Sequence, residues 1–311
     1  MKFSSPKYIL IGYEGFIGGE LNSQIINKMG LVLVGFEKDT RLEYIHFTEK
    51  NFTYFKDING IFILGGASSA PMYFNEKCGD SYHLTLEPMI SATRLSSKIK
   101  RPIIYATTSH TQHATTGYTC AMLARQNLAK GFSTETGVPT LGLSFYSVYG
   151  SSEWRKQQYA NVISQMIWCA LFKKPFKIFG DGKQTRDFIH VDDVVSALLK
   201  GIDYLQDKKG SYIFHIGNNR SYSFNDVAAE INKYITLECK YIDNPIKENY
   251  VANTLAQKED INITKRELNW EPKVSFEDGI KKCFYDYKIQ YDQGLLDLSL
   301  YDVNFLNFWS I

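Results

Sequence analysis

The most constraining feature of the chain is a three-glycine turn near its N-terminus. Residues 12–18 read G-x-x-G-x-x-G and stand between a short apolar run, residues 8–11, and a helical stretch that starts at Phe16. A strand, a glycine turn and a helix in this order open a βαβ unit. Glycine permits the tight turn and lets phosphate oxygens approach the amides at the helix N-terminus, where the helix dipole favours negative charge. The motif predicts a dinucleotide site. Its contact residues are expected to be Gly12, Gly15, Phe16, Ile17 and Gly18.

A dinucleotide site of this type has an acidic residue at the end of the second strand, and Glu37 stands there, nineteen residues after Gly18. A carboxylate accepts hydrogen bonds from the ribose hydroxyls and repels a 2′-phosphate, so Glu37 favours NAD over NADP. NADP is the alternative cofactor, since either Lys38 or Arg41 could hold the 2′-phosphate. Glu37 could also have no cofactor role and simply begin a solvated loop. Three further residues follow another predicted strand and suit close contact with the cofactor, although a plain tight turn has the same pattern: Gly65, Gly66 and Ala67.

Short apolar runs alternate with helical stretches over the first two thirds of the chain. The predicted strands are residues 8–11, 31–36, 60–64, 102–106 and 138–145, and the predicted helices are 16–29, 83–98 with a break near Pro88, and 118–136. Strands joined by helices are typical of a doubly wound parallel α/β sheet. After Gly150 the pattern changes to shorter elements, which predicts a smaller C-terminal α/β lobe.

Composition excludes several classes of protein. With 44% apolar and 22% charged residues, the 311-residue chain is not globally disordered. A net charge of +2 gives no field that would recruit nucleic acid or an acidic membrane. The apolar runs are too short for a bilayer helix, and the first of them is read as a strand and not as a signal peptide. The five cysteines are scattered, with no C-x-x-C, so we expect no disulfide framework, no metal site and a cytoplasmic location.

Residues 178–193 have the sequence IFGDGKQTRDFIHVDD, which resembles the signature of extended short-chain dehydrogenase/reductases of the nucleotide-sugar epimerase/dehydratase family. Two later stretches, residues 214–218 (FHIGN) and 268–272 (LNWEP), resemble further landmarks of that family. The resemblance implies a Rossmann domain of residues 1–150 plus about 187–216, which binds NAD. It also implies a nucleotide-sugar lobe formed by about 151–186 and 217–311.

The same resemblance implies where the sugar nucleotide binds. Arg186 is expected to contact the diphosphate, which suits a planar, permanently charged donor, and Asn161 to hydrogen-bond the same group. The substrate-binding residues implied are Ser147, Asn161, Arg186 and Arg220. The family often carries an Arg and an Asp before its last landmark, but Tyr250 and Asn253 stand there. Because of this departure, the sequence does not identify the base of the nucleotide.

Catalysis in the family uses a Ser or Thr, a Tyr, and a Lys four residues after that Tyr. Thr108, which follows a predicted strand, and Tyr118, which opens a helix, resemble the first two. The resemblance implies that Tyr118 accepts the proton of a sugar hydroxyl which Thr108 orients. Met122 occupies the lysine position, where it would lie beside the cofactor but supplies neither charge nor donor.

The missing lysine predicts slow or altered turnover, because a nearby positive charge is what would lower the pKa of the tyrosine. His110 and His113 could relay a proton, or could be ordinary loop residues. The dehydratase branch of the family has an acidic residue one or two positions after its Ser or Thr. Ser109 and His110 stand at those positions, so we expect no 4,6-dehydratase activity.

The function expected from these residues is that of an NAD-dependent oxidoreductase, which oxidises the C4 hydroxyl of a nucleotide-linked hexose or heptose to a 4-keto sugar. A C4 epimerase with no net redox change is the alternative, and a non-catalytic nucleotide-sugar-binding subunit is the third. By the same resemblance we expect a homo-oligomer, a dimer or tetramer, that serves polysaccharide biosynthesis. The base, the sugar and the direction of reaction are left open by the sequence.

Overall fold

A computed structural model describes residues 7–25, 30–34, 55, 57–73, 78–108, 116–243 and 258–297. The chain divides into two compact units. Unit 1 comprises Met1–Phe145, Val195–Ile216 and Asn262–Trp270, and unit 2 comprises Tyr146–Val194, Gly217–Ile261 and Glu271–Ile311.

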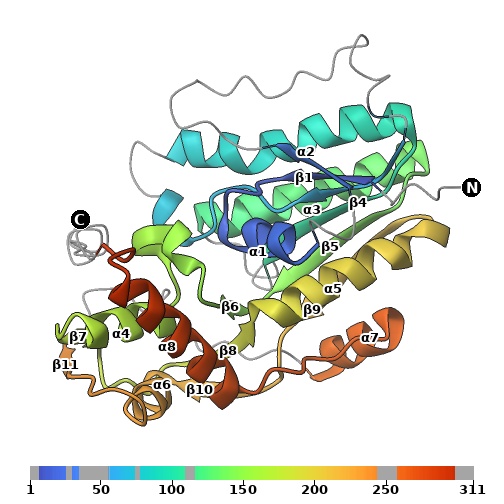
Figure 1. Cartoon of the computed structure of the whole chain (residues 1–311). Helices are drawn as coiled ribbons and strands as arrows, with labels where there is room; N and C mark the ends of the chain where they lie inside the picture. The colour runs from blue at the N-terminus through green and yellow to red at the C-terminus, as the bar shows by residue number, and fades with distance from the viewer. Residues whose placement is uncertain are drawn as a thin grey trace, which may run out of the picture. The chain divides into compact units, whose positions relative to one another are not determined.

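Unit 1 is built on a six-stranded parallel sheet in the order β2-β1-β3-β4-β5-β9 (Figure 1). The strands are β1 (Lys7–Ile11), β2 (Gly30–Val34), β3 (Ile58–Ile63), β4 (Ile103–Thr108), β5 (Thr140–Phe145) and β9 (Ser211–Ile216). The helices are α1 (Phe16–Ile25), α2 (Cys78–Ile99), α3 (Gly117–Thr136) and the greater parts of α5 (Val191–Tyr204) and α7 (Lys258–Leu268). The predicted doubly wound parallel fold is confirmed.

The strands are mostly apolar because both faces of the sheet are covered. One face of β3 and β4 presents Ile61 and Tyr105 to a cluster that includes Met89 of α2 and Ala129 of α3. On the same strand, Gly60 directly precedes Ile61. A Cβ built on Gly60 would come within 2.6 Å of the Ile202 side chain of α5. The alternation of a strand therefore sends neighbouring residues to helices on opposite faces.

The strand order places β1 between β2 and β3, and the chain changes direction across the sheet at β1. In open α/β sheets, ligands bind outside the carboxyl ends of the strands at such a switch point. Here those ends carry the turn after β1, which contains Gly12, and the turn after β3, which contains Gly65. The two glycine-rich stretches of the sequence therefore meet where this fold binds ligands.

The predicted break near Pro88 is wrong. Helix α2 runs without interruption from Cys78 to Ile99 with Pro88 inside it. Proline removes one backbone hydrogen bond from a helix and crowds the preceding turn. In α2 that cost is offset by a buried face, because Thr85, Pro88, Met89 and Ala92 are all buried against the unit. Local propensity predicted a break, and packing overrides it.

The described residues of unit 2 form two small sheets and three main helices. Strands β10, β8 and β6 form one sheet, in which β8 pairs antiparallel with β10 and parallel with β6, and β11 pairs parallel with β7. The strands are β6 (Ser147–Tyr149), β7 (Phe176–Phe179), β8 (Thr185–His190), β10 (Ser221–Ser223) and β11 (Cys239–Ile242). The helices are α4 (Val162–Leu171), α6 (Phe224–Ile231) and α8 (Phe276–Asp292), with a 3₁₀ helix at Glu153–Tyr159.

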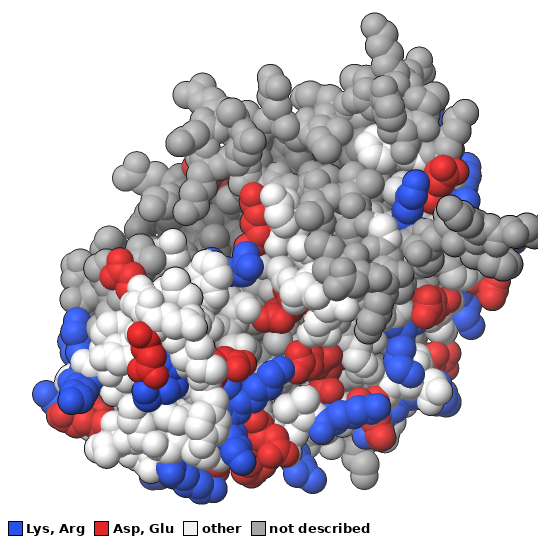
Figure 2. All heavy atoms as spheres, viewed as in Figure 1, with Lys and Arg blue, Asp and Glu red and all other residues white. Residues whose placement is uncertain are grey.

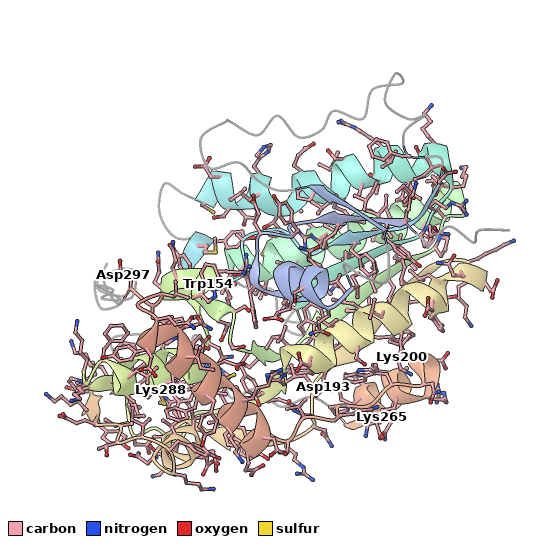
Figure 3. The ribbon with its side chains drawn as sticks, viewed as in Figure 1. Trp154, Asp193, Lys200, Lys265, Lys288 and Asp297 are labelled. Carbon is pink, nitrogen blue, oxygen red and sulfur yellow. The ribbon has the colours of Figure 1, made fainter. Side chains whose placement is uncertain are left out.

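An aromatic core holds these elements together. The Trp168 ring of α4 meets the Tyr287 ring of α8 edge-on at 5.4 Å, and both side chains are almost completely buried. Tyr287 keeps its hydroxyl satisfied by donating to the carbonyl of Gly150 at 2.8 Å. Asp193 accepts the backbone N–H groups of Lys273 and Val274 at 2.9 and 3.0 Å, which ties the entry of α8 to the start of α5 (Figure 3).

His190 at the end of β8 is buried, with 1% of its surface exposed. Its Nδ1 accepts the backbone N–H of Asp192 at 3.2 Å, and its ring meets Tyr149 edge-on at 5.3 Å. Burial lowers the pKa of His190 from 6.5 to about 4, assisted by Lys282 and opposed by Asp192 and Asp286. The imidazole is therefore neutral in the folded protein at neutral pH.

This burial predicts acid sensitivity. Between pH 6.5 and about 4 the unfolded chain binds a proton at His190 that the folded protein does not, so stability falls as the pH falls. The decrease in the free energy of unfolding that is due to His190 reaches about 3 kcal/mol near pH 4. Urea unfolding of the protein and of His190→Gln across this pH range measures the decrease. The free energy of unfolding of the variant should depend less on pH, because the variant lacks the contribution of His190. His83→Gln, at an exposed position of α2, is the control, and equal slopes for the protein and His190→Gln would contradict the prediction.

Within the described ranges no helix combines the length and the apolar character that crossing a bilayer requires. On the face shown in Figure 2, acidic and basic side chains are interspersed over the described residues. Figure 2 thus shows no continuous region of one charge on that face, which agrees with the net charge of +2.

Candidate functional site

Two of the three glycines in the N-terminal motif are required by the fold itself. A Cβ on Gly12, whose φ is +91°, would lie 2.3 Å from the backbone nitrogen of Gly65. A Cβ on Gly18 would lie 2.1 Å from the carbonyl oxygen of Gly12. Both distances are shorter than any real contact, so these glycines let the turn after β1 close onto α1 and onto the turn after β3.

Gly15 differs from these two glycines. It is exposed at the N-terminal end of α1, its N–H donates to the Gly12 carbonyl at 3.2 Å, and a Cβ there would meet only that oxygen, at 3.4 Å. Nothing in the described chain demands a glycine at this place. The missing side chain instead leaves the start of α1 open to a ligand, and helix N-termini bind phosphate.

The other predicted cofactor residues lie around the same edge. Phe16 is buried, so its side chain faces the interior, and Ile17 is partly buried. Gly66 has a φ of +140°, and Ala67 donates its N–H to Thr85 Oγ1 at 3.2 Å. Glu37 lies outside the described residues, as do Lys38 and Arg41.

Thr108 and Tyr118 are brought together at the carboxyl end of β4. Thr108 is the last residue of that strand, and Tyr118 is the second residue of α3, whose N-cap is Thr116. The two side chains are hydrogen-bonded. Burial raises the pKa of Tyr118, while the bond with Thr108 and the charge of Arg125 lower it. This is the arrangement that a phenol needs to exchange a proton with a hydroxyl held beside it.

Met122 stands one helical turn after Tyr118 and is 5% exposed. Residues four apart lie on one face of a helix, so an apolar thioether occupies the position next to the phenol. The segment with Ser109, His110 and His113 lies outside the described residues.

Arg125 was missed by the sequence reasoning. It is fully buried, and its guanidinium donates to three backbone carbonyls: Ala106 at 3.0 Å, Gly65 at 2.9 Å and Thr85 at 3.1 Å. A Cβ on Gly66 would come within 2.8 Å of its Nη2. A signal for it was present, because an arginine seven residues after Tyr118 falls on the same helix face as the tyrosine.

A second tyrosine flanks the pair. Tyr73, in the 3₁₀ helix Ala70–Tyr73, lies with its ring 5.9 Å from that of Tyr118, and its hydroxyl is 2.5 Å from Thr85 Oγ1. Burial raises the pKa of Tyr73 to about 12. Tyr73 is therefore protonated at neutral pH and forms an aromatic wall beside Tyr118.

The predicted substrate residues lie in unit 2. Arg186 on β8 is half-buried, donates from Nη1 to the carbonyl of Thr185 at 2.8 Å, and lies over the Phe224 ring at 5.7 Å. Burial lowers the pKa of the Arg186 guanidinium below its usual value. Ser147 begins β6 and pairs in register with Phe188 of β8, and Arg220 is exposed before β10. Tyr250 and Asn253 lie outside the described residues.

Asn161 is the N-cap of α4. Its Oδ1 accepts the N–H of Ile163 at 3.3 Å, and its Nδ2 donates to the carbonyl of Val148 at 3.2 Å. Its own backbone N–H donates to Glu153 Oε1 at 2.9 Å. Glu153, which sequence reasoning also missed, is completely buried, and burial raises its pKa against the opposing influence of Lys156. Glu153 therefore holds the loop that carries Asn161.

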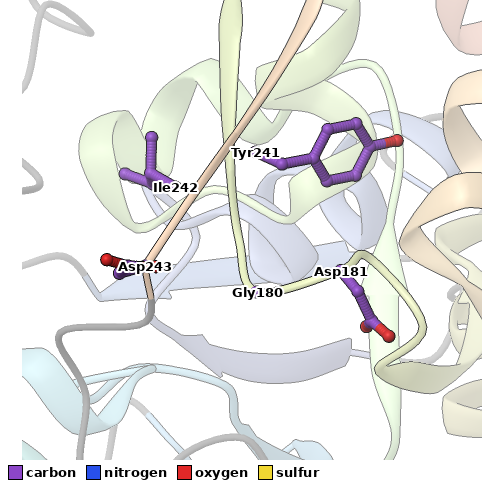
Figure 4. A pocket seen from close by; sticks show the side chains of 5 residues that line it. All are labelled: Gly180, Asp181, Tyr241, Ile242 and Asp243. Carbon is purple, nitrogen blue, oxygen red and sulfur yellow. The ribbon is translucent and has the colours of Figure 1, made fainter.

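The glycine–aspartate–glycine turn of the signature segment lies at the ends of β7 and β11. A shallow pocket there is lined by Gly180, Asp181, Tyr241, Ile242 and Asp243 (Figure 4). Tyr241 donates to Asn225 Oδ1 at 2.9 Å, and Asn225 donates to the carbonyl of Asp181 at 3.0 Å. The turn is thus held against α6.

Comparison with known proteins gives three kinds of match. The profile of the NAD dependent epimerase/dehydratase family matches residues 91–217. The UDP-N-acetyl-alpha-D-glucosaminuronate decarboxylase of Bacillus cytotoxicus is 28% identical over 168 residues, 53% of this chain and 51% of the decarboxylase, so the match spans about half of that relative. Protein CapI of Staphylococcus aureus is 22% identical over 92% of this chain and 99% of CapI.

Among solved structures, a variant of the UDP-glucuronic acid 4-epimerase of Bacillus cereus, in complex with UDP-4-deoxy-4-fluoro-glucuronic acid and NAD, superposes with a TM-score of 0.76. It is 19% identical, and the match covers 92% of this chain and 99% of the epimerase. The family profile, the relatives and the fold agree with the signature in the sequence: residues 91–217 match the NAD dependent epimerase/dehydratase family, and the chain has the fold of the extended short-chain dehydrogenase/reductases among the solved structures.

Proposed function

We propose that the protein is an NAD-dependent oxidoreductase that oxidises the C4 hydroxyl of a nucleotide-linked hexose or heptose. The observation that carries this proposal is the hydrogen-bonded pair of Thr108 and Tyr118 at the carboxyl end of β4. It stands on the same sheet edge as the glycine turns of the switch point. A proton acceptor beside a dinucleotide site is what oxidation of an alcohol requires.

The cofactor site has features that fit NAD. The exposed Gly15 leaves the N-terminus of α1 free to receive the pyrophosphate, and the backbone of Gly65 and Gly66 lines the neighbouring strand end. Glu37 follows β2 in the sequence, where a carboxylate would hold the adenosine ribose. When bound, NAD supplies the acceptor for a hydride.

In this proposal the chain's own residues handle the proton. Thr108 orients the substrate hydroxyl, and Tyr118 accepts its proton at Oη. Because burial raises the pKa of Tyr118, the phenol is mostly protonated in the resting protein at neutral pH. Positive charge near the ring is needed to favour the ionised form.

Unit 2 and the relatives support the proposed substrate class. Arg186 and Asn161 offer a guanidinium and an amide, which suit a diphosphate. The B. cereus epimerase binds a UDP sugar and NAD, and the B. cytotoxicus relative is a decarboxylase of a UDP sugar acid. We therefore expect a nucleoside diphosphate sugar, and the resemblance to CapI supports a role in polysaccharide biosynthesis.

Oxidation at C4 is compatible with more than one end product. An epimerase returns the hydride to the other face of the same carbon. In a sugar with a C6 carboxylate, a C4 ketone makes the carboxylate a β-keto acid, which loses CO₂ readily. The similarity to a decarboxylase favours including sugar acids among the substrates.

A direct assay tests the proposal. The protein is incubated with NAD and, one at a time, the UDP, dTDP, GDP and CDP forms of neutral hexoses, hexuronic acids and heptoses. Absorbance at 340 nm and mass spectrometry follow NADH and sugar product. We expect a 4-keto sugar with NADH. Recovery of the C4 epimer without NADH establishes the alternative, and tight binding of both ligands without turnover overturns the oxidoreductase assignment in favour of a binding subunit.

A further inference from the structure

We propose that Arg125 is a positioning residue for the Thr108–Tyr118 pair: its buried guanidinium supplies, from the next turns of α3, the fixed positive charge that Met122 cannot supply. This inference rests on the proposed function, because it concerns the same phenol. It assigns a role to a buried cation that neither the motifs nor the comparisons single out.

The helix geometry places the three residues in one row. Tyr118, Met122 and Arg125 are spaced by four and three residues, which is one face of an α-helix. Helical side chains point back towards the N-terminus of their helix, so the long side chain of Arg125 extends in the direction of Tyr118. Met122 stands between them in the helix row and supplies neither charge nor donor.

Backbone carbonyls hold the guanidinium in place. Its Nη1 donates to the carbonyl of Ala106, two residues before Thr108 on β4, and its Nη2 donates to the carbonyl of Gly65. Nε donates to the carbonyl of Thr85, whose hydroxyl contacts Tyr73 and thereby the wall beside Tyr118. The charge is therefore fixed relative to both members of the pair.

The guanidinium of Arg125 is shielded from water. Arg125 is 1% exposed, and an arginine does not lose its proton in a protein. Its charge lowers the pKa of Tyr118, and it does the same for the neighbouring Tyr73 and Tyr105, in each case against burial, which is the larger influence. A lysine at 122 would also reach the cofactor ribose, whereas Arg125 contributes charge alone.

Arg125 also cross-links the sheet edge to α2, so its loss affects stability as well. Two substitutions separate these roles. Arg125→Lys keeps the charge and loses most of the carbonyl bonds, while Arg125→Gln loses the charge. If the role of Arg125 is purely structural, the pKa of Tyr118 should be similar in the two variants.

The readout is the ionisation of Tyr118 itself, measured without substrate or cofactor. The protein is labelled with ¹³Cζ-tyrosine, the Tyr118 signal is assigned by its absence in Tyr118→Phe, and its chemical shift is followed against pH. We expect the Tyr118 pKa to rise by about one unit or more in Arg125→Gln. We expect a clearly smaller rise in Arg125→Lys and none in Arg94→Gln, an exposed arginine on α2.

An unchanged Tyr118 pKa in a folded Arg125→Gln variant overturns the inference, and so do equal shifts in the Gln and Lys variants. If Arg125→Gln does not fold, the unmodified protein provides the test: Tyr118 must ionise while the protein is still folded. A Tyr118 that stays protonated until the protein unfolds overturns the inference. Because the titration needs no turnover, it is independent of whether the substrate assignment is correct.

Discussion

Replacing Tyr118 with phenylalanine is expected to lower the rate of NADH formation by about 10²- to 10⁴-fold, the usual contribution of a general acid–base residue. The variant loses only the hydroxyl that is bonded to Thr108, and Tyr118 is partly buried in an aromatic cluster that tolerates the phenyl ring. The folded state should therefore persist, and the loss should fall on kcat. Steady-state kinetics with the substrate found in the panel, together with the thermal midpoint, measure both effects.

Tyr82→Phe is the matched control, because Tyr82 belongs to the same cluster and meets the Tyr73 ring edge-on at 5.4 Å. Its removal should change the rate less than about threefold, as expected for a residue away from the reacting atoms. Thr108→Ala should be slowed and Thr108→Ser should recover most of the rate, since serine restores the hydroxyl. A Tyr118→Phe protein that retains full activity would exclude Tyr118 as the base.

Alanine at Gly12 or Gly18 is expected to abolish folding, whereas alanine at Gly15 should leave the fold intact and weaken NAD binding. At Gly12 the new Cβ would lie 2.3 Å from a backbone nitrogen at a positive φ, and at Gly18 it would lie 2.1 Å from a carbonyl oxygen. Backbone atoms cannot move away cheaply, so we expect a loss of more than about 4 kcal/mol for each.

At Gly15 the Cβ is tolerated at 3.4 Å, so the stability should change by less than about 1 kcal/mol. The methyl group would occupy the approach of the pyrophosphate, and the Kd for NAD should rise about tenfold or more, or 1.4 kcal/mol. Calorimetric titration with NAD and thermal unfolding separate the two effects. Gly131→Ala, at an open position on α3, is the control and should leave the Kd unchanged. Unaltered NAD affinity in Gly15→Ala would place the pyrophosphate elsewhere.

The order of strands and helices in unit 1 was readable from the chain because its determinants are local. Apolar runs of five or six residues alternate with helices, and the signature IFGDGKQTRDFIHVDD is contiguous in the sequence. The pairing of Thr108 with Tyr118 was also anticipated, through the resemblance to a family. The continuous α2 was not anticipated, because the buried partners that offset the cost of Pro88 come from distant strands.

Glu153 and Arg125 show the same limit at the site. Both are charged residues, and both prove to be buried, with 0% and 1% of their surfaces exposed. Their partners, such as Ser164 for Glu153 and Gly65 for Arg125, lie 11 and 60 residues away along the chain.

Local pattern was sufficient for the glycine turn, the parallel sheet and the absence of a lysine at 122, because each depends on residue type and short spacing. Three-dimensional packing was needed to distinguish Gly15 from Gly12 and Gly18, to bury His190, and to bury the arginine whose charge lowers the pKa of Tyr118. The difference is physical: burial and electrostatic influence depend on distances between atoms that the folded chain brings together, and spacing along the sequence does not encode those distances.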